Sequence, residues 1–356
     1  MEESSEQMKF VHDKMRRRSR KMNLTKRRWI VLILCCLVNL CLGSIYAWSV
    51  FAAPMAEYLS GITGAALTTG DLAIVYTIAN GVGPITMISG GFFNDKLGPK
   101  RVIFVGGLMF GLGVILSGFV TSGPALIVAY GLLGGLGLGM AYGCAISTGV
   151  KFFPDKRGLV GGITTAVYGL SSVILPPIAT ALVERLGIAV TFRVIGIVFL
   201  VVICVSSLFL IQCPADFVPE GWTPPAATGA KQTVPDKKWN EMLQSPVFYV
   251  MILMMLCGAL SGMMIISQAK TVASDMILMT GEAATLAVSV LALFNAFGRV
   301  AAGTLSDKIG RINTLTIALC LSVAGLLMLF FCGEGTLLPF FIGVAIVGVS
   351  FGSFMG

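Results

Sequence analysis

The chain has 356 residues, of which 56% are hydrophobic and 12% are charged, and its mean hydropathy is +0.90. A water-soluble domain cannot bury so much apolar surface, so the composition excludes that class and indicates a membrane-embedded protein. The formal net charge of +8 arises largely from residues that flank apolar runs. It therefore indicates membrane topology and gives no support for nucleic-acid binding.

Ten apolar segments follow one another along the chain, and each is long enough as a helix to cross about 30 Å of hydrocarbon. The sequence therefore predicts an all-α polytopic membrane protein. The ten expected spans are roughly 29–52, 72–93, 101–121, 124–148, 158–181, 189–211, 246–268, 284–306, 313–332 and 336–356.

Basic residues gather on one side of the expected spans. Ten lie in the tail 1–28, and others follow the second, fourth, sixth and eighth spans, whereas only Arg185, Arg193 and Lys270 fall on the opposite side. Cytoplasmic loops carry the excess of Lys and Arg in membrane proteins. We therefore expect a cytoplasmic N-terminus.

Four glycines recur every four residues along the fourth expected span, at Gly131, Gly135, Gly139 and Gly143. Small residues at this spacing form a flat stripe on a helix. The pattern predicts that another helix approaches closely there.

A repeat relates the two halves of the chain. GGFFNDKLGPKR (90–101) follows the second expected span, and AGTLSDKIGR (302–311) follows the eighth. A shift of 212 residues superposes the two segments, which pairs Gly91 with Gly303, Asp95 with Asp307, Lys96 with Lys308 and Gly98 with Gly310.

The repeat and the long polar loop together predict the domain organisation. We expect a basic cytoplasmic tail (1–28), an N-terminal six-helix bundle (29–211), a central cytoplasmic loop (212–245) and a C-terminal bundle (246–356). The last bundle contains helices 7–10 only, so helices 11 and 12 are expected to be missing from the chain. Two parallel halves around a central cavity are one established transporter design.

The repeated G-x-x-x-D-K-x-G pattern has a physical interpretation. Glycine permits a close helix approach and a tight turn, and the Asp can accept hydrogen bonds from a neighbouring helix N-terminus. Lys and Arg, including Arg311, hold the segment at the cytoplasmic lipid surface. We interpret both segments as conformational latches between the halves, and an ordinary tight turn is the alternative.

These segments resemble the signature loops of the major facilitator superfamily. Three longer stretches are similar to the oxalate/formate antiporter family, namely GSIYAWSVFAAPM (43–55), AYGCAISTGVKFFPDKRGLVGGITTAVYGL (141–170) and LFNAFGRVAAGTLSDKIGR (293–311). Within the second stretch, FFPDKRGL is the strongest single match. The resemblance implies a 6+6 helix bundle with a parallel two-fold repeat, truncated here to about ten transmembrane helices. It also implies a location in the inner (plasma) membrane.

Arg299 is the candidate substrate-binding residue. It lies eight residues from Asp307, which is roughly 12 Å along a helix. A cation near the centre of a membrane helix costs about 2.5–3.5 kcal/mol to insert. The repeat places Met87 at the equivalent position of the first half, so the scaffold itself needs no cation there. The resemblance implies that Arg299 binds the anion, together with a Lys on the missing helix 11, and a structural role is the alternative.

Four aromatic residues match cage positions of the family by resemblance, namely Tyr46, Trp48, Tyr142 and Tyr168. Their hydroxyl and indole N–H groups could donate hydrogen bonds to an anion. The alternative for Trp48 is a place in an interfacial aromatic belt, and the alternative for the tyrosines is plain packing.

The predicted function is exchange of small organic carboxylates, oxalate/formate-like, by alternating access. All seventeen Asp and Glu residues lie in the tail, in loops or near helix ends, and proton coupling usually relies on a titratable group inside the membrane. The alternatives are a monocarboxylate uniporter or proton symporter for lactate, pyruvate or formate, and a non-transporting carboxylate sensor. Nucleophile, metal-ligand or acid–base constellations are not evident, so we expect no enzyme activity, cofactor or metal. The expected partners are the carboxylate anion and membrane lipid, with no nucleic acid, and the expected state is a monomer.

Overall fold

A computed structural model of the chain describes residues 24–214, 217–223, 239–279 and 281–356. These residues fold almost entirely into helices, and none of them belongs to a β-strand. The predicted all-α fold class is therefore confirmed. The described chain divides into two compact units, which are treated separately below.

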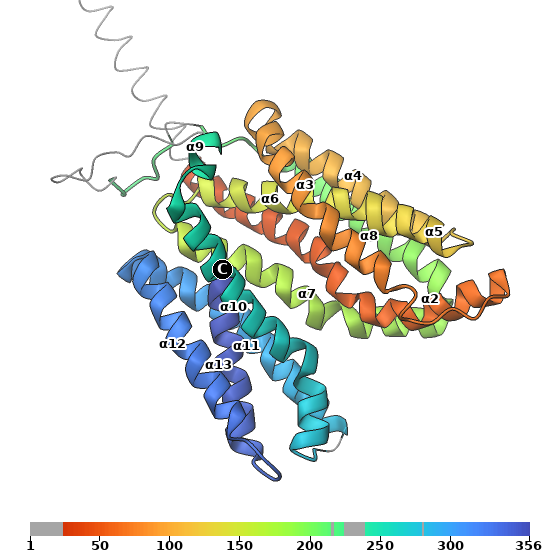
Figure 1. Cartoon of the computed structure of the whole chain (residues 1–356). Helices are drawn as coiled ribbons and strands as arrows, with labels where there is room; N and C mark the ends of the chain where they lie inside the picture. Colours follow the sequence, from red (N-terminus) through yellow and green to blue (C-terminus); the bar gives the residue numbers. More distant parts are fainter. Residues whose placement is uncertain (1–23, 215–216, 224–238, 280) are drawn as a thin grey trace, which may run out of the picture. The chain divides into compact units, whose positions relative to one another are not determined.

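The first unit, called the N-terminal unit, comprises residues 30–151 and 158–213. Its first helix belongs to a continuous helical stretch, Leu24–Thr63, that contains a short 3₁₀ turn, η1. The elements of the unit are η1 (Gly43–Ala47), α2 (Trp48–Thr63), α3 (Ala73–Leu97), α4 (Pro99–Ser117), α5 (Gly123–Leu126), the π-helical stretch η2 (Ile127–Gly134), α6 (Gly135–Lys151), α7 (Arg157–Leu186) and α8 (Ile188–Phe209). In this unit α4 packs against α8 and α6, and α3 packs against α6 (Figure 1).

Local signals set the ends of these helices. Gly64 ends α2 with a positive φ of 70°, a conformation that glycine adopts without strain. Before α3, the hydroxyl oxygen of Thr68 accepts the N–H of Asp71, and the Asp71 carboxylate accepts the N–H and hydroxyl of Thr68 at 2.8 and 2.7 Å. The two hydrogen bonds that the Asp71 carboxylate accepts lower its pKa below the usual value, and the bond from the backbone N–H of Thr68 contributes most.

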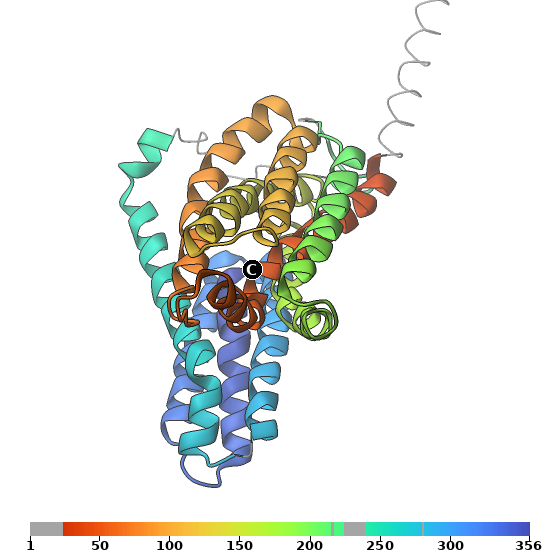
Figure 2. The same ribbon diagram turned by 90° about the vertical axis from the view of Figure 1, so that its right-hand side faces the viewer.

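The second unit, called the C-terminal unit, comprises the described parts of 1–29, 152–157 and 214–356. Its elements are α9 (Trp239–Leu243), α10 (Pro246–Thr271), the π-helical turn η3 (Val272–Met276), α11 (Gly281–Ile309), α12 (Arg311–Phe330) and α13 (Leu337–Met355). Helix α13 packs against α11, α12 and α10, and Figure 2 shows it between these neighbours. The unit is therefore built around α13.

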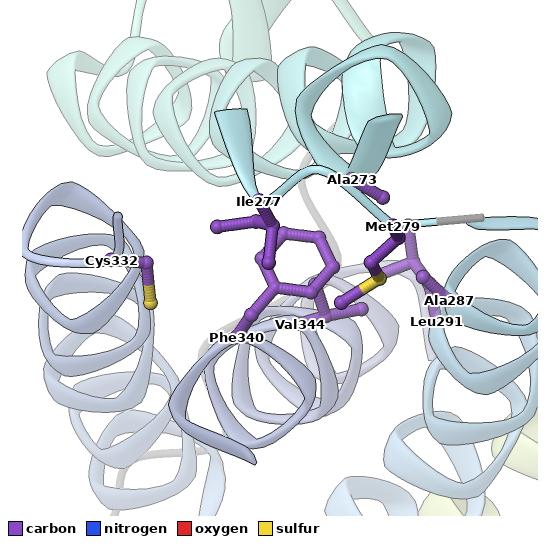
Figure 3. Close-up of a cluster of buried hydrophobic side chains, with 8 residues drawn as sticks. All are labelled: Ala273, Ile277, Met279, Ala287, Leu291, Cys332, Phe340 and Val344. Carbon is purple, nitrogen blue, oxygen red and sulfur yellow. The ribbon is translucent and has the colours of Figure 1, made fainter. Parts of the chain in front are cut away.

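A buried apolar cluster closes one end of the C-terminal unit. It consists of Ala273, Ile277, Met279, Ala287, Leu291, Cys332, Phe340 and Val344. Figure 3 shows Ile277 and Met279 pointing toward Phe340 and Val344. Leu278 between them has a φ of +60°, which is unusual for a non-glycine residue. This turn lies between η3 and α11 in the chain, and both neighbours of Leu278 belong to the cluster.

The FFPDKRGL segment organises the start of the described chain. Nη1 of Arg28 lies 2.8 Å from Oδ1 of Asp155, and both side chains are about nine-tenths buried. The Arg28 guanidinium also covers the ring of Phe153 at 4.6 Å, and that ring meets the Trp29 ring edge-on at 5.0 Å. A largely buried ion pair and a cation–π contact thus attach the start of the first helix to the FFPDKRGL segment.

Nine described helical stretches are long and apolar enough to cross a membrane. The ten spans expected from the sequence correspond to these nine and to α11, a 29-residue helix that carries Arg299 and is not among the nine. Helix α3 continues to Leu97, so Asp95 and Lys96 lie in its last turn and not in a loop as expected. The expected bundle boundaries, 29–211 and 246–356, stay a prediction.

Candidate functional site

Arg299 lies in α11 and is only 5% exposed. Its Nε donates a hydrogen bond of 3.0 Å to Oδ1 of Asn295, one helical turn earlier. An amide oxygen satisfies one donor of a guanidinium without cancelling its charge. Arg299 is therefore a buried cation, and one of its hydrogen bonds goes to a neutral side chain on its own helix.

Two glycines of α13 and the glycine that caps it fix the backbone around this pair. A Cβ added at Gly352 would collide with the carbonyl oxygen of Asn295 and lie 3.0 Å from the backbone N of Arg299. One added at Gly356 would lie 2.8 Å from the carbonyl oxygen of Arg299, and one at Gly348 would lie 2.9 Å from that of Leu291. Helices α11 and α13 thus meet backbone to backbone along a glycine seam, which is the name used below for this contact.

The sequence analysis missed the glycine seam of α13. Its signal was present, because Gly348, Gly352 and Gly356 recur every four residues as the glycines of the fourth span do. The aromatic residues between them are packing residues, since Phe351 and Phe354 are buried and rest on Gly262 and Gly258 of α10.

The N-terminal unit contains the same seam between α3 and α6. Added Cβ atoms at Gly135, Gly139 and Gly143 would meet Ala79, Gly83 and Met87, respectively. The repeat shift carries these three α3 positions onto Leu291, Asn295 and Arg299. A Cβ added at Gly131 would lie 3.2 Å from the carbonyl oxygen of Val75 in α3, so the predicted close approach along the fourth span is confirmed for all four glycines. Arg299 stands where the equivalent seam has Met87.

Three of the four predicted aromatic residues lie together in the N-terminal unit. The ring of Tyr168 in α7 meets the ring of Tyr142 in α6 at 4.5 Å and that of Tyr46 in η1 at 5.2 Å. Tyr168 is 7% exposed, whereas Tyr46 is 38% exposed. Within the cluster, Tyr168 is therefore buried and Tyr46 is accessible.

The tyrosine cluster depends on a close contact between the first helix and α7. A Cβ at Gly43 would collide with the carbonyl oxygen of Tyr168, so only glycine fits there. One turn earlier, buried Asn39 donates a 3.2 Å hydrogen bond from Nδ2 to the carbonyl oxygen of Thr164. These two contacts bring Tyr46 over Tyr168.

Trp48 belongs to a different aromatic group. Its ring lies 4.9 Å from that of Tyr130, which in turn meets Phe192 at 5.9 Å, and Phe51 completes the group. Trp48 is 6% exposed. The structure thus separates it from the tyrosines, and its role as a substrate contact stays a prediction.

The two signature turns have the same backbone conformation. Gly98 and Gly310 have φ values of 80° and 87° and the same ψ of 161°, and each precedes the next helix by one residue. These angles favour glycine, and the tight turn predicted at both positions is confirmed.

The aspartate of the first signature segment joins α3 to α6. Oδ1 of Asp95 lies 2.9 Å from Nζ of Lys151 in an exposed ion pair, and Lys96 covers the ring of Phe92 at 4.2 Å. An added Cβ at Gly91 would meet no atom within 4 Å, whereas one at Gly90 would lie 3.3 Å from Cα of Met140. In the N-terminal unit the close approach therefore belongs to Gly90.

A sequence model of the Major Facilitator Superfamily matches residues 21–356. The chain belongs to this family. It is therefore a multi-pass membrane transporter and not an enzyme. Among the residues that the structure describes, no group of three or more His, Cys, Asp or Glu side chains could hold a metal ion.

Similar proteins agree with this assignment. The chain is 31% identical over 299 residues to the oxalate:formate antiporter of Oxalobacter formigenes, covering 83% of this chain and 67% of the antiporter. It is 29% identical over 331 residues to YhjX, an uncharacterized MFS-type transporter of Escherichia coli K12, covering 93% and 78% of the two chains. The resemblance to the oxalate/formate antiporter family is thereby confirmed.

The fold is also that of a solved family member. The structure of the proton:xylose symporter XylE superposes with a TM-score of 0.64 at 14% identity, covering 93% of this chain and 81% of XylE. The predicted major-facilitator-like bundle is confirmed at the level of the fold.

Proposed function

We propose that this transporter exchanges small organic carboxylate anions across the plasma membrane by alternating access, with its N-terminus in the cytoplasm. The observation that carries the proposal is the buried Arg299 in an apolar helix, held by the neutral amide of Asn295. A charged side chain within a membrane span is costly and marks substrate pathways in transporters.

The chemistry of Arg299 suits a carboxylate. A guanidinium donates two parallel hydrogen bonds to the two oxygens of a carboxylate, which a Lys cannot do. Tyrosine hydroxyls also donate to anions, and the N-terminal unit gathers Tyr46, Tyr142 and Tyr168 in one cluster. We assign Arg299 the charge contact and the tyrosines a second contact that excludes water.

The acidic residues favour exchange over proton coupling. In the C-terminal unit, α10, α12 and α13 contain no Asp or Glu, and those of α11, Glu282 and Asp307, stand near its two ends. A proton-coupled mechanism usually needs a titratable group within the membrane. The similarity to the oxalate:formate antiporter supports the same direction and makes oxalate and formate the first substrates to test.

Counterflow in proteoliposomes tests the proposal. Vesicles that contain the purified protein are loaded with oxalate, formate, lactate or pyruvate, and uptake of each labelled acid is followed with and without a pH gradient. We expect uptake that requires a carboxylate inside the vesicle and does not respond to the gradient. Binding without uptake would favour a sensor, and uptake driven by the pH gradient would favour a proton symporter.

A further inference from the structure

We propose that Asn39 is a positioning residue of the carboxylate site. Its side-chain hydrogen bond sets the register of the first helix along α7, and this register places Tyr46 on Tyr168. The inference rests on the proposed function, because Asn39 acts on carboxylate binding through the tyrosine cluster and does not itself touch the substrate.

Asn39 makes an unusual contact for a buried polar residue of this unit. It is completely buried in the first helix, and its Nδ2 donates a hydrogen bond of 3.2 Å to the carbonyl oxygen of Thr164 in α7. Other buried hydroxyl groups, such as those of Ser117 and Thr148, donate to the carbonyl oxygen four residues earlier on their own helix. Asn39 instead joins two helices that are far apart in sequence.

The Asn39 amide is costly where it lies. Because a carbonyl only accepts, the atom of Asn39 that faces Thr164 must be its nitrogen. Among the residues that the structure describes, the buried Oδ1 of Asn39 has no hydrogen-bond partner. The Thr164 carbonyl lies inside α7, where a helical N–H already satisfies it. The amide is therefore not needed to satisfy the backbone, and its burial lowers stability.

The amide supplies a restraint along the helix axis. The second contact between the two helices is at Gly43, where an added Cβ would collide with the carbonyl oxygen of Tyr168. Asn39 and Gly43 are four residues apart, and so are Thr164 and Tyr168, so the helices run parallel and stay in register over one turn. The glycine contact allows the close approach, and the directional hydrogen bond resists sliding. A single buried asparagine is known to fix the register of paired helices at a cost in stability.

The 3₁₀ turn η1 carries this register to the tyrosine cluster. Tyr46 follows Gly43 by three residues within η1. Side chains three residues apart lie on the same face of a 3₁₀-helix, so Tyr46 continues the face of Gly43 toward α7, and its ring lies 5.2 Å from that of Tyr168. A slide of the first helix along α7 would move the Tyr46 hydroxyl away from its place beside Tyr168 and weaken its contact with the anion.

Asn39→Leu tests this assignment in counterflow, because leucine branches at the same atom as asparagine but forms no hydrogen bond. It should raise the half-saturating carboxylate concentration about tenfold, the effect of losing one hydrogen bond to a charged group, with a smaller change in maximal rate. The thermal unfolding temperature should be unchanged or raised, because the unpaired oxygen is gone. A merely structural Asn39 would not give lower affinity in a protein of undiminished stability.

A double-mutant cycle with Tyr46→Phe tests the path of the effect. If Asn39 acts through the Tyr46 hydroxyl, Asn39→Leu should add little to the half-saturating concentration of Tyr46→Phe. Fully additive effects of the two substitutions would overturn the inference.

Thr86→Val is the matched control. The buried Thr86 hydroxyl donates a hydrogen bond of 2.7 Å to the carbonyl oxygen of Leu136, so it joins α3 to α6 as Asn39 joins the first helix to α7. Its removal should keep the parental half-saturating concentration. Asn39→Ala removes the amide without adding methyl groups, and it should raise the half-saturating concentration as Asn39→Leu does. Parental values in both Asn39 variants, or loss of folded protein in both, would overturn the positioning role.

The inference and the proposed function fail differently. If the parent exchanges carboxylate and the Asn39 variants do so with the parental half-saturating concentration, only the positioning role is wrong. If the parent exchanges no carboxylate in the same assay, the proposed function fails and the role of Asn39 falls with it.

Discussion

The α3/α6 pair of the N-terminal unit and the α11/α13 pair of the C-terminal unit are two copies of one contact. In both, three glycines spaced four residues apart let two helices meet at backbone distance. The copies differ in charge at one facing position, where α3 carries Met87, 46% exposed, and α11 carries Arg299, 5% exposed. The glycines therefore belong to the scaffold that both copies share, and we propose that the arginine serves transport.

The largest expected effect comes from breaking the scaffold that the two copies share. Gly352→Ala and Gly139→Ala each add a Cβ that collides with a backbone carbonyl, of Asn295 and Gly83 respectively. Because backbone cannot move aside as a flexible side chain can, each should destabilise its unit by about 1–3 kcal/mol. Thermal unfolding of the purified variants measures the effect.

Gly81→Ala is the matched control. Gly81 lies in α3, the helix that Gly139 meets, and nothing lies within 4 Å of a Cβ added to it. It should leave thermal stability unchanged or slightly raised, as expected for alanine in a helix. A stable Gly352→Ala protein beside an unstable Gly139→Ala protein would show that the two seams are not equivalent.

A smaller effect is expected when Arg299 keeps its charge but loses its shape. Arg299→Lys should lower exchange about tenfold, because one of two parallel hydrogen bonds to the carboxylate is lost. The loss should be larger for oxalate, a planar dicarboxylate, than for formate. Equal losses for both acids would contradict a two-pronged contact.

The smallest effect on stability is expected at the signature segment of α3. The Asp95–Lys151 pair is exposed, so Asp95→Asn should change the free energy of unfolding by less than about 1 kcal/mol. If Asp95 also acts as a latch, the variant should slow exchange while carboxylate affinity stays the same. Lys151→Gln removes the same ion pair, and an equal slowing in both variants would assign the effect to that pair alone.

The sequence predicted those features that depend on local pattern. Apolar run length located the long helices, and the four-residue glycine spacing of the fourth span predicted its close contact. Gly98 and Gly310 were recognised as turn residues because only glycine adopts their backbone angles readily. The function class followed from one buried cation in an apolar segment and from the family resemblance.

Features that depend on distant partners could not be predicted. The tyrosine cluster requires Gly43 to meet the backbone at Tyr168, more than a hundred residues away. Trp48 follows Tyr46 by two residues, yet the helix directs its ring to Tyr130 instead. The end of α3 was placed too early, because Asp95 and Lys96 lower hydropathy without ending the helix.

Removing the charge of Arg299 tests the central claim most directly. Arg299→Gln should reduce carboxylate counterflow about thirtyfold or more, because a buried anion then loses its charged partner, while thermal stability is kept or increased. Arg185→Gln, which removes an exposed arginine at the end of α7, should leave counterflow at the parental rate. A folded Arg299→Gln protein that exchanges carboxylate at the parental rate would contradict the account.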